Sequence, residues 1–174
     1  MKPLSRSEIK RLYPGNEIDR TAIIYPGVTI GKNNYIGPQC IIGGSAEKIG
    51  FFDKVGRVYI GDNNRFTKQV TIDSGTTLIT KIGSDCIMLK NAHIGHDASI
   101  QDNCILSCNV IIGGWCTVEE NVGFGIGAMT QDRTTVRHRC YIGMGCVYLK
   151  STEAAPGMTY VGNPAVILGK NKKY

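Results

Sequence analysis

The chain has 174 residues, of which 20 % are charged and 42 % are hydrophobic, and its formal net charge is +6. This length suits one domain, and this composition is typical of a globular chain and excludes a disordered one. The apolar runs are too short for a membrane span, and no apolar segment follows the basic start MKPLSRSEIK. We therefore expect a cytoplasmic protein with no membrane span. The basic residues are scattered without an RNA-binding signature, so we expect no nucleic-acid partner.

Residues 1–17 precede any repeat and carry the signal of a helix start. Ser5 and Glu8 have the spacing of a capping box, and the segment Tyr13-Pro14-Gly15 is suited to ending a helix. We predict that this short helix covers the open end of the structure that follows.

From residue 18 to about residue 150, with one gap between Ile42 and Ile60, an apolar side chain recurs at every sixth position except Thr130. These ladder residues are Ile18, Ile24, Ile30, Ile36, Ile42, Ile60, Phe66, Ile72 and Leu78, and then, after a slip of four, Ile82, Met88, Ile94, Ile100, Leu106, Ile112, Val118, Phe124, Thr130, Val136, Ile142 and Tyr148. Asp85, Asn103 and Asn121 are eighteen apart, which indicates one left-handed corner for every three hexads. The period predicts an all-β fold, a parallel β-helix of triangular section with roughly seven coils.

Cysteine is frequent, but its placement follows the repeat. Six of the seven cysteines stand two residues before a ladder residue: Cys40, Cys86, Cys104, Cys116, Cys140 and Cys146. Alternation along a strand turns this position toward the interior, as it does the ladder residue. We interpret these cysteines as small hydrophobic filler, and neither a disulfide framework nor a zinc ribbon fits their spacing.

Two segments interrupt the repeat. The ladder lapses between Ile42 and Ile60, which are eighteen residues apart, and we interpret this interval as one coil that has lost its core positions and become a loop at 44–57. Phe51 and Phe52 on this loop suggest burial against another subunit. A smaller irregularity covers 73–81. The predicted organisation is a cap helix at 1–17, a β-helix at 18–150 with the loop 44–57, and a C-terminal extension at 151–174.

The segment NAHIGHD at 91–97 contains two of the three histidines. By the alternation His93 points outward, and His96 lies near a corner after Gly95, which we expect in the left-handed region. Two solvated surface histidines are one interpretation. A metal site is another, but it needs a third ligand, and His138 belongs to a different wall unless a trimer brings the walls together.

Proton transfer is a third interpretation. A neutral imidazole at His96 suits general-base work near neutral pH, and Asp97 or a carbonyl could fix its tautomer. Gly114 stands one coil later, where its N–H, free of any side chain, is suited to stabilising an oxyanion. A base beside an oxyanion donor describes acyl transfer from a thioester to a hydroxyl or an amine.

The ladder resembles the left-handed β-helix of hexapeptide-repeat acyltransferases. VYIGDNNRFTKQVTIDSGT and TKIGSDCIMLKNAHIGHDASIQDNCILSCNVIIGG are similar to UDP-N-acetylglucosamine acyltransferases, and the resemblance covers about 18–150 with HIGHD as its most specific part. It implies a homotrimer with active sites in the clefts between subunits. It also implies that His96 is the catalytic base, that His93 helps to position the sugar nucleotide, and that Gly114 donates its N–H to the thioester carbonyl.

The sequence departs from that family at several expected contacts. Glu47 and Lys48, on the loop that corresponds to the family's sugar-contacting loop, stand where the family has an amide and a carboxylate. Trp115 stands where the family has a histidine, and Gln131 and Asp132 replace a His-Gln pair. The substrate contacts that we expect are therefore His93, Glu47, Lys48, Asp73, Trp115, Gln131 and Asp132.

The C-terminal segment GMTYVGNPAVILGKNKKY is similar to coenzyme-A-dependent sugar acetyltransferases of the same superfamily, in place of the helical domain of UDP-N-acetylglucosamine acyltransferases. The resemblance makes Asn163 and Lys170 candidate contacts for coenzyme A. A lysine could pair with a phosphate as a point charge. A solvated tail is the alternative.

These observations together predict an acyltransferase that moves an acyl group, with acetyl expected, from acyl-CoA to an amino or hydroxyl group of a nucleotide-linked sugar. Acyl-CoA is then a co-substrate, and we expect neither a tightly bound cofactor nor a metal. The alternatives are an acyl-carrier-protein-dependent O-acyltransferase of the UDP-N-acetylglucosamine type, a metal enzyme of the γ-carbonic anhydrase kind, and a non-catalytic scaffold.

Overall fold

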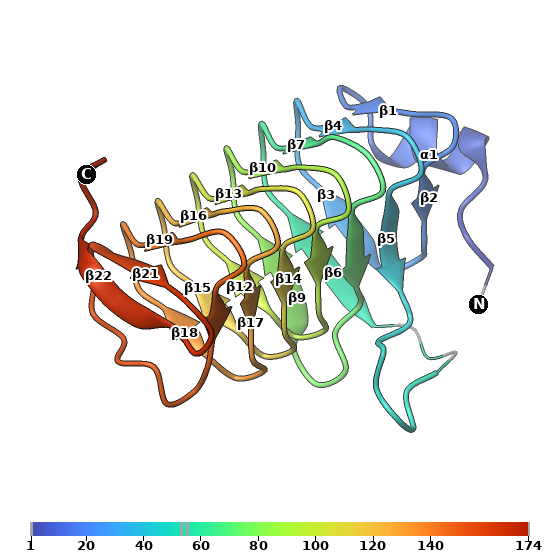
Figure 1. The fold of residues 1–174 in the computed structure, drawn as a ribbon. Helices are drawn as coiled ribbons and strands as arrows, with labels where there is room; N and C mark the ends of the chain where they lie inside the picture. Colours follow the sequence, from blue (N-terminus) through green and yellow to red (C-terminus); the bar gives the residue numbers. More distant parts are fainter. Residues whose placement is uncertain (1, 53, 55, 174) are drawn as a thin grey trace.

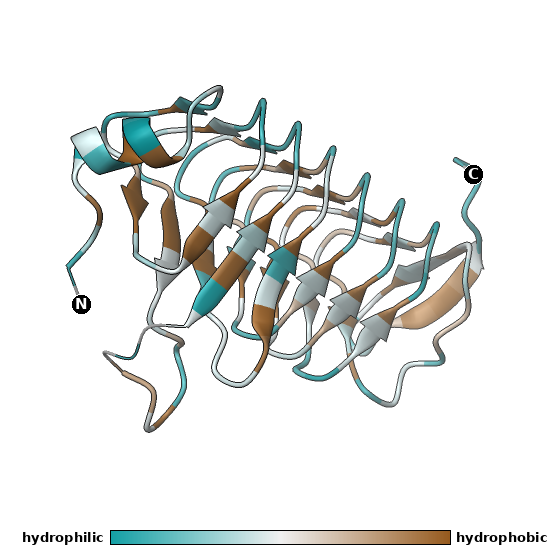
Figure 2. Ribbon diagram, turned by 180° about the vertical axis from the view of Figure 1, so that it is seen from behind, coloured by the Kyte–Doolittle hydropathy of each residue, from teal (hydrophilic) through white to brown (hydrophobic). Residues whose placement is uncertain are grey.

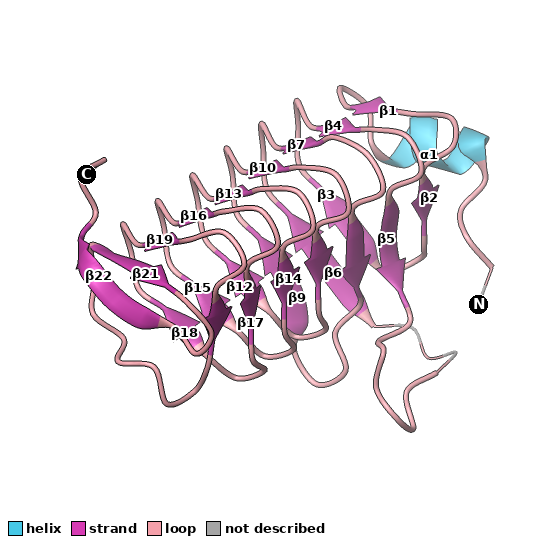
Figure 3. Cartoon of the chain, in the orientation of Figure 1, coloured by secondary structure: helices cyan, strands magenta, loops and turns pink. Residues whose placement is uncertain are grey.

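The chain forms a parallel β-helix of triangular cross-section, in a computed structural model that describes residues 2–52, 54 and 56–173 (Figure 1). Each coil contributes short strands joined by corners, and equivalent strands of successive coils stack into three sheets, here called walls A, B and C (Figure 3). The predicted fold class is confirmed. Over the residues that the structure describes, wall A contains eight parallel strands before its last, antiparallel one, so the helix has about eight coils and not seven.

Wall A consists of β1 (Glu17–Ile18), β4 (Tyr35–Ile36), β7 (Arg65–Phe66), β10 (Ile87–Met88), β13 (Ile105–Leu106), β16 (Gly123–Phe124), β19 (Tyr141–Ile142), β21 (Met158–Val161) and β22 (Val166–Lys170). Wall B consists of β2 (Ile23–Ile24), β5 (Ile41–Gly44), β8 (Thr71–Asp73), β11 (His93–Ile94), β14 (Ile111–Ile112), β17 (Met129–Thr130) and β20 (Val147–Tyr148). Wall C consists of β3 (Val28–Ile30), β6 (Arg57–Ile60), β9 (Ile79–Ile82), β12 (Ser99–Ile100), β15 (Thr117–Val118) and β18 (Thr135–Val136).

The one helix among the described residues, α1 (Arg6–Leu12), stands at the N-terminal end of the β-helix (Figure 1). Ser5 is its N-cap, and both hydrogen bonds of the capping box with Glu8 are present, as predicted. Ile9 is buried, and the hydroxyl of Tyr13 donates to the carbonyl of Val28 at 2.8 Å, which fastens the helix over the first coils. No helix in the described part of the chain is long and apolar enough to cross a bilayer.

The interior is filled by the ladder residues and by the small residues two positions before them. All six cysteines of the repeat are at most 1 % exposed, which confirms that they are filler, whereas Cys108 is only half-buried. Figure 2 shows hydrophilic residues along the upper corners, and strands in which hydrophobic segments alternate with more polar ones. One predicted ladder residue is wrong: Leu78 is 62 % exposed, because it lies in the irregular segment before β9.

Left-handed residues occur at all three corners of the coil, whereas the sequence predicted only one such corner per coil. Asn103 and Asn109 have φ values of 57° and 59° at two different corners of the same coil. The prediction for Gly95 is also wrong, because the left-handed residue of its corner is Asp97, with φ of 61°. Gly95 is required for another reason: a Cβ there would lie 2.8 Å from the backbone nitrogen of Gly114 in the next coil.

Both interruptions of the repeat occur at the corner between walls B and C. Val28 pairs with Val58, thirty residues later, where regular coils are eighteen apart, so the loop 44–57 adds twelve residues at a corner and no coil is lost. Val58 pairs with Thr80, twenty-two residues later, which confirms the slip of four. The larger loop extends below the walls in Figure 1, beside the smaller one.

The division at 17 and 150 stays a prediction. Past residue 150 the chain still follows the coil, because β21 pairs in parallel with β19 and the side chain of Tyr160 is fully buried. Only β22 breaks the pattern, returning antiparallel along β21.

We expect the seven thiols to differ sharply in reactivity. Under native conditions iodoacetamide should add one label per chain, at Cys108, because the others are enclosed and burial raises the pKa of the Cys40, Cys140 and Cys146 thiols. Mass spectrometry of intact and digested protein would locate the label. A Cys108→Ser variant should take no label until it is denatured, and native labelling at Cys40 would contradict the packing described here.

Candidate active site

The corner between walls B and C brings the predicted catalytic residues into one column. His96 and Asp97 occupy this corner in one coil, and Gly114 and Trp115 occupy it in the next. The N–H of Trp115 donates to the carbonyl of His96 at 3.0 Å, and the N–H of Arg133, one coil further, donates to the carbonyl of Gly114 at 2.8 Å. Backbone pairing therefore sets the spacing of the column.

Asp97 is held by the smaller of the two inserted segments. Its Oδ1 accepts the backbone N–H groups of Thr76, Thr77 and Leu78 at 2.9, 2.9 and 2.6 Å, and its Oδ2 accepts the hydroxyl of Thr76 at 2.6 Å. The backbone N–H of Asp97 donates to the hydroxyl of Thr80 at 2.8 Å. The carboxyl group is fully enclosed and held from several directions.

This environment keeps Asp97 ionised. Burial raises the pKa of its carboxyl group, but the hydrogen bonds from Thr76, His96 and the backbone outweigh burial and hold the pKa well below its usual range. Nδ1 of His96 lies 2.8 Å from Oδ2 of Asp97. Because a carboxylate only accepts, Nδ1 must carry the proton, and Nε2 of the neutral ring is left with its lone pair.

Gly114 faces the imidazole of His96 from the next coil. A Cβ at position 114 would lie 3.0 Å from both Cε1 and Nε2 of His96, so any side chain there would crowd the lone pair of Nε2. The N–H of Gly114 forms no hydrogen bond with any residue that the structure describes. A free donor therefore stands beside a nitrogen that can accept a proton.

Trp115 lies against this pair. Its ring meets that of His96 edge to face, with centroids 4.3 Å apart, and its Nε1–H donates to the hydroxyl of Thr77 at 3.4 Å. Two cations lie over the indole: Nζ of Lys48 is 4.4 Å and Cζ of Arg133 is 4.0 Å from the ring centroid. The site thus has an aromatic side that is surrounded by positive charge.

The loop 44–57 also contacts this group, through the side chain of Lys48. Nζ of Lys48 also lies 4.4 Å from the ring of Phe51 and 3.5 Å from the hydroxyl of Thr76, so the loop contacts the clamp around Asp97. The N–H of Glu47 donates to Oδ2 of Asp73 at 3.1 Å, while the side chain of Glu47 is exposed. Residues 53 and 55 of the predicted loop 44–57 lie outside the described residues.

His93 and Asp73 form a second polar pair on wall B. Nδ1 of His93 lies 2.8 Å from the hydroxyl of Thr71, and its Nε2 lies 4.0 Å from Oδ2 of Asp73. Burial raises the pKa of Asp73, against the lowering effects of the Glu47 N–H and of His93. The side chain of His93 is 29 % exposed, so its outer edge can be reached from solvent.

Other predicted contacts lie further away in the chain. Gln131 and Asp132 follow two coils after His96, where Asp132 pairs with Arg133 at 2.8 Å. Asn163 lies in an exposed turn fastened to Val147 at the end of wall B. The structure therefore does not bring these three residues into the group around His96.

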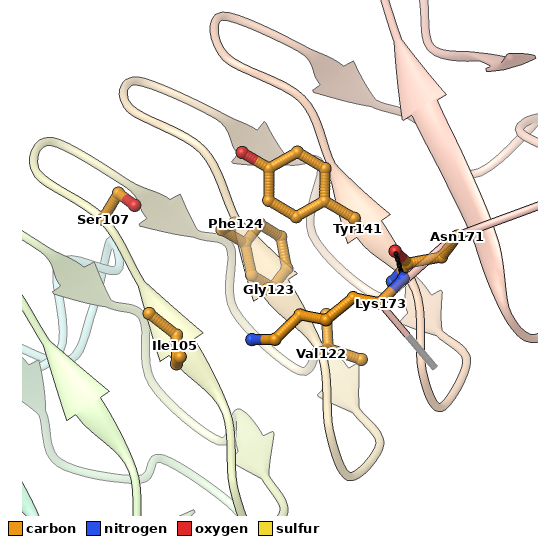
Figure 4. A pocket seen from close by; sticks show the side chains of 8 residues that line it. All are labelled: Ile105, Ser107, Val122, Gly123, Phe124, Tyr141, Asn171 and Lys173. Carbon is orange, nitrogen blue, oxygen red and sulfur yellow. Dashed lines mark hydrogen bonds between the residues drawn. The ribbon is translucent and has the colours of Figure 1, made fainter.

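Lys170 lies on β22 of wall A, away from the column on the corner between walls B and C. The tail beyond it borders a hollow of about 150 Å³ on the same wall (Figure 4). This hollow is lined by Ile105, Ser107, Val122, Gly123, Phe124, Tyr141, Asn171 and Lys173. Figure 4 shows the side chain of Lys173 extending from the tail across the wall toward Ile105.

His138 does not join the other histidines within one chain. It follows β18 of wall C, and its Nδ1 lies 3.0 Å from Oε2 of Glu119, which also pairs with Arg137. Among the described residues no three side chains of His, Cys, Asp or Glu come together as a metal site would require.

Sequence reasoning missed the residues that hold Asp97. Thr76, Thr77 and Leu78 reach it from an insertion, so they are not at multiples of eighteen from it, and only the slip of four pointed to this segment. Arg133 could have been found, because it is one coil of eighteen beyond Trp115 and shares its corner position.

Comparisons with known proteins agree on an acyltransferase type of β-helix. No family model matches the chain. An acyl-[acyl-carrier-protein]–UDP-N-acetylglucosamine O-acyltransferase of Sinorhizobium fredii is 30 % identical over 160 residues, which cover 90 % of this chain and 58 % of that protein. A solved UDP-N-acetylglucosamine acyltransferase of Bacteroides fragilis superposes with a TM-score of 0.81 at 25 % identity, over 90 % of this chain and 62 % of that one.

A more distant match extends the fold to acetyltransferases. The perosamine N-acetyltransferase of Caulobacter crescentus, solved with CoA and GDP-perosamine, superposes with a TM-score of 0.56 at 19 % identity, over 89 % of this chain and 57 % of that one. This chain spans about three fifths of the length of the first two relatives. Over that span it has the left-handed β-helix of the hexapeptide-repeat acyltransferases, and it resembles that superfamily in sequence and in structure.

Proposed function

We propose that the chain is an acyltransferase that moves an acyl group from acyl-CoA, with acetyl as the expected group, to an amino or hydroxyl group of a nucleotide-linked sugar. The observation that carries this proposal is the pair of His96 and Asp97 beside the free N–H of Gly114. The names of the relatives, which act on UDP-N-acetylglucosamine, support the reaction class.

His96 acts as the general base in this proposal. Nε2 takes the proton of the acceptor as its oxygen or nitrogen attacks the thioester carbonyl, and Asp97 stabilises the imidazolium that forms. When the tetrahedral intermediate collapses, the carbon–sulfur bond breaks and the proton of Nε2 passes to the leaving thiolate. The clamp around Asp97 holds the ring in the tautomer that this step needs.

Gly114 stabilises the oxyanion of that intermediate. Its N–H has no partner among the described residues, and a Cβ at this position would lie 3.0 Å from Nε2 of His96. A donor fixed by the backbone needs no rearrangement as charge develops on the carbonyl oxygen. The absence of a side chain at position 114 is what allows a substrate to reach both groups.

In this proposal the sugar is held on the wall B side of His96, by His93, Asp73 and the loop 44–57. His93 and Asp73 offer polar atoms beside the base, and Glu47 and Lys48 come from the loop that contacts them. Lys48 and Trp115 replace the carboxylate and histidine expected from the resemblance. We infer that the acceptor sugar differs from N-acetylglucosamine in the groups that these two side chains meet.

Acyl carrier protein is the second candidate donor, because the Sinorhizobium fredii relative is named for it. Coenzyme A is favoured by the turn at Asn163, which resembles that of sugar acetyltransferases and stacks on Val147 of wall B, itself three coils from His93. Lys170 belongs to another wall, so it would contact the same donor only from a second copy of the chain.

A homotrimer is supported by the outer surface of wall B. Outward residues of this wall are apolar and 36–43 % exposed on both sides of His93: Ile23, Ile41, Ile111 and Met129. The same outward positions on wall C are polar in several coils, such as Lys81 and Thr117. Packing another copy on wall B would bury this stripe and place His93 in a cleft between subunits.

The cellular location that we propose is the cytoplasm. All seven cysteines are free of disulfide bonds, which fits a cytoplasmic protein.

We expect His96→Ala to lower kcat/KM by about 10²- to 10⁴-fold, because the general base is lost. Mass spectrometry would follow acylation of UDP- and dTDP-linked sugars with acetyl-CoA, and with acyl carrier protein thioesters in a second series. His138→Ala is the matched control and should keep the wild-type rate. A folded His96→Ala protein with full activity would remove the proposed base.

Asp97→Asn should destabilise the protein at pH 7 by about 2 kcal/mol, because the ionised carboxylate interacts with donors that an amide cannot satisfy equally. The folded-state pKa of Asp97 is depressed, so this stabilisation is present above the unfolded pKa of about 3.9 and is lost as pH falls toward the folded value. Urea unfolding between pH 7 and pH 3 should show the gap closing. Asp85→Asn at another left-handed corner should show none, and a gap independent of pH would contradict the clamp.

Met129→Glu should disrupt assembly, because it places a charge in the apolar stripe of wall B. Light scattering after gel filtration should give three times the 18.9 kDa chain mass for the wild type and a smaller mass for the variant. Thr135→Glu on wall C is the matched control and should remain trimeric. A monomeric wild type would overturn the proposed assembly.

A further inference from the structure

A hollow of about 400 Å³ lies on wall C, on the far side of the Asp97 corner from His93. It is lined by Arg57, Thr77, Leu78, Ile79, Lys81, Asp97, Ser99, Trp115 and Thr117. The first of these residues opens β6, and three others stand in register on β9, β12 and β15, facing outward. The irregular segment before β9 forms the opposite rim.

Four polar side chains of this hollow have no partner within the described part of the chain. The guanidinium of Arg57, the ammonium of Lys81 and the hydroxyls of Ser99 and Thr117 form no hydrogen bond or ion pair with any residue that the structure describes. All four can donate, and both cations are exposed. A set of donors on one concavity is suited to an acceptor with several oxygen atoms.

The charge in the hollow is positive. Among the described residues its only carboxylate is Asp97, whose oxygens accept hydrogen bonds from the 76–78 segment and from His96 and whose side chain is fully enclosed. Lys81 also borders the next hollow along wall C, which contains Asp102 and Glu120. The positively charged region therefore lies at the edge of wall C that adjoins the Asp97 corner.

We propose that this hollow binds the phosphate groups of a substrate, specifically the diphosphate of the sugar nucleotide or that of coenzyme A. An arginine fork with a lysine and two hydroxyls matches phosphate oxygens, by bidentate and point-charge contacts. Trp115 lines the hollow and contacts the ring of His96. A diphosphate bound here would therefore lie beside the indole ring that packs against the proposed base. This inference rests on the proposed function for the identity of its ligands.

Trp115 also provides a direct readout of binding, because it is the only tryptophan of the chain. Inorganic pyrophosphate should change its fluorescence saturably, with an affinity that falls as salt is added. Arg57→Gln and Lys81→Gln should each weaken binding by about tenfold, because each removes a charge-assisted contact. Lys90→Gln, an exposed cation at a corner between walls A and B, is the matched control and should bind as the wild type does.

Competition identifies the source of the diphosphate. If UDP displaces pyrophosphate and coenzyme A does not, the hollow holds the acceptor, and the reverse result assigns it to the donor. A lack of any fluorescence change, with calorimetry also showing no pyrophosphate binding, would overturn the proposal. So would equal affinity in Arg57→Gln, Lys81→Gln and wild type.

The two proposals fail separately. Pyrophosphate binding that depends on Arg57 and Lys81, without acyl transfer from any donor, would leave the anion site standing and remove the proposed reaction. Acyl transfer that depends on His96, with unchanged KM for both substrates in Arg57→Gln and Lys81→Gln, would remove the anion site alone.

Discussion

The hydrogen bonds between successive coils are the constraint on which the site depends. Each rung places its corner about 4.8 Å from the next, so a residue on one coil meets the residue eighteen positions later. This spacing sets Gly114 against His96 and Trp115 against Arg133 without any side-chain interaction being needed. It also explains Gly95, where a Cβ would collide with the backbone of the next coil. The positions of the site residues are therefore set by the backbone hydrogen bonds that hold the whole stack together.

The chemistry arises where the regular stack is interrupted. A buried carboxylate is costly unless donors surround it. The corner of the next coil, where the repeat is regular, leaves the N–H of Gly114 free but pairs that of Trp115 with the carbonyl of His96, so a regular corner does not turn several N–H groups toward one carboxylate. The four-residue insertion before β9 turns three N–H groups toward Asp97 and adds the hydroxyl of Thr76. The larger loop then brings Lys48 onto both Thr76 and Trp115. Two insertions at one corner thus hold the imidazole in place.

The sequence predicted what repeats and failed where the repeat breaks. The period of six gave the walls, the interior cysteines and the slip of four, because inward positions in each coil meet the same steric demand. The apolar character of Leu78 was misleading, since an inserted segment has no fixed register and this side chain faces solvent. The interval from Ile42 to Ile60 has the length of a coil, and only strand pairing distinguishes a lost coil from twelve added residues. Gly95 suggested positive φ, whereas its role is close packing.

The outward residues, more than the inward ones, distinguish wall B from wall C. Inside, each wall contributes similar ladder residues, so the interior does not determine which wall binds what. Outside, wall B carries Ile111 and Met129, and wall C carries Lys81 and Thr117. The exposed apolar stripe of wall B is suited to packing against another protein surface. The hollow of wall C, with its free hydrogen-bond donors, is suited to binding an anion. The corner between these two walls holds His96. A sugar nucleotide or thioester bound there would therefore have a protein surface on one side and cationic groups on the other.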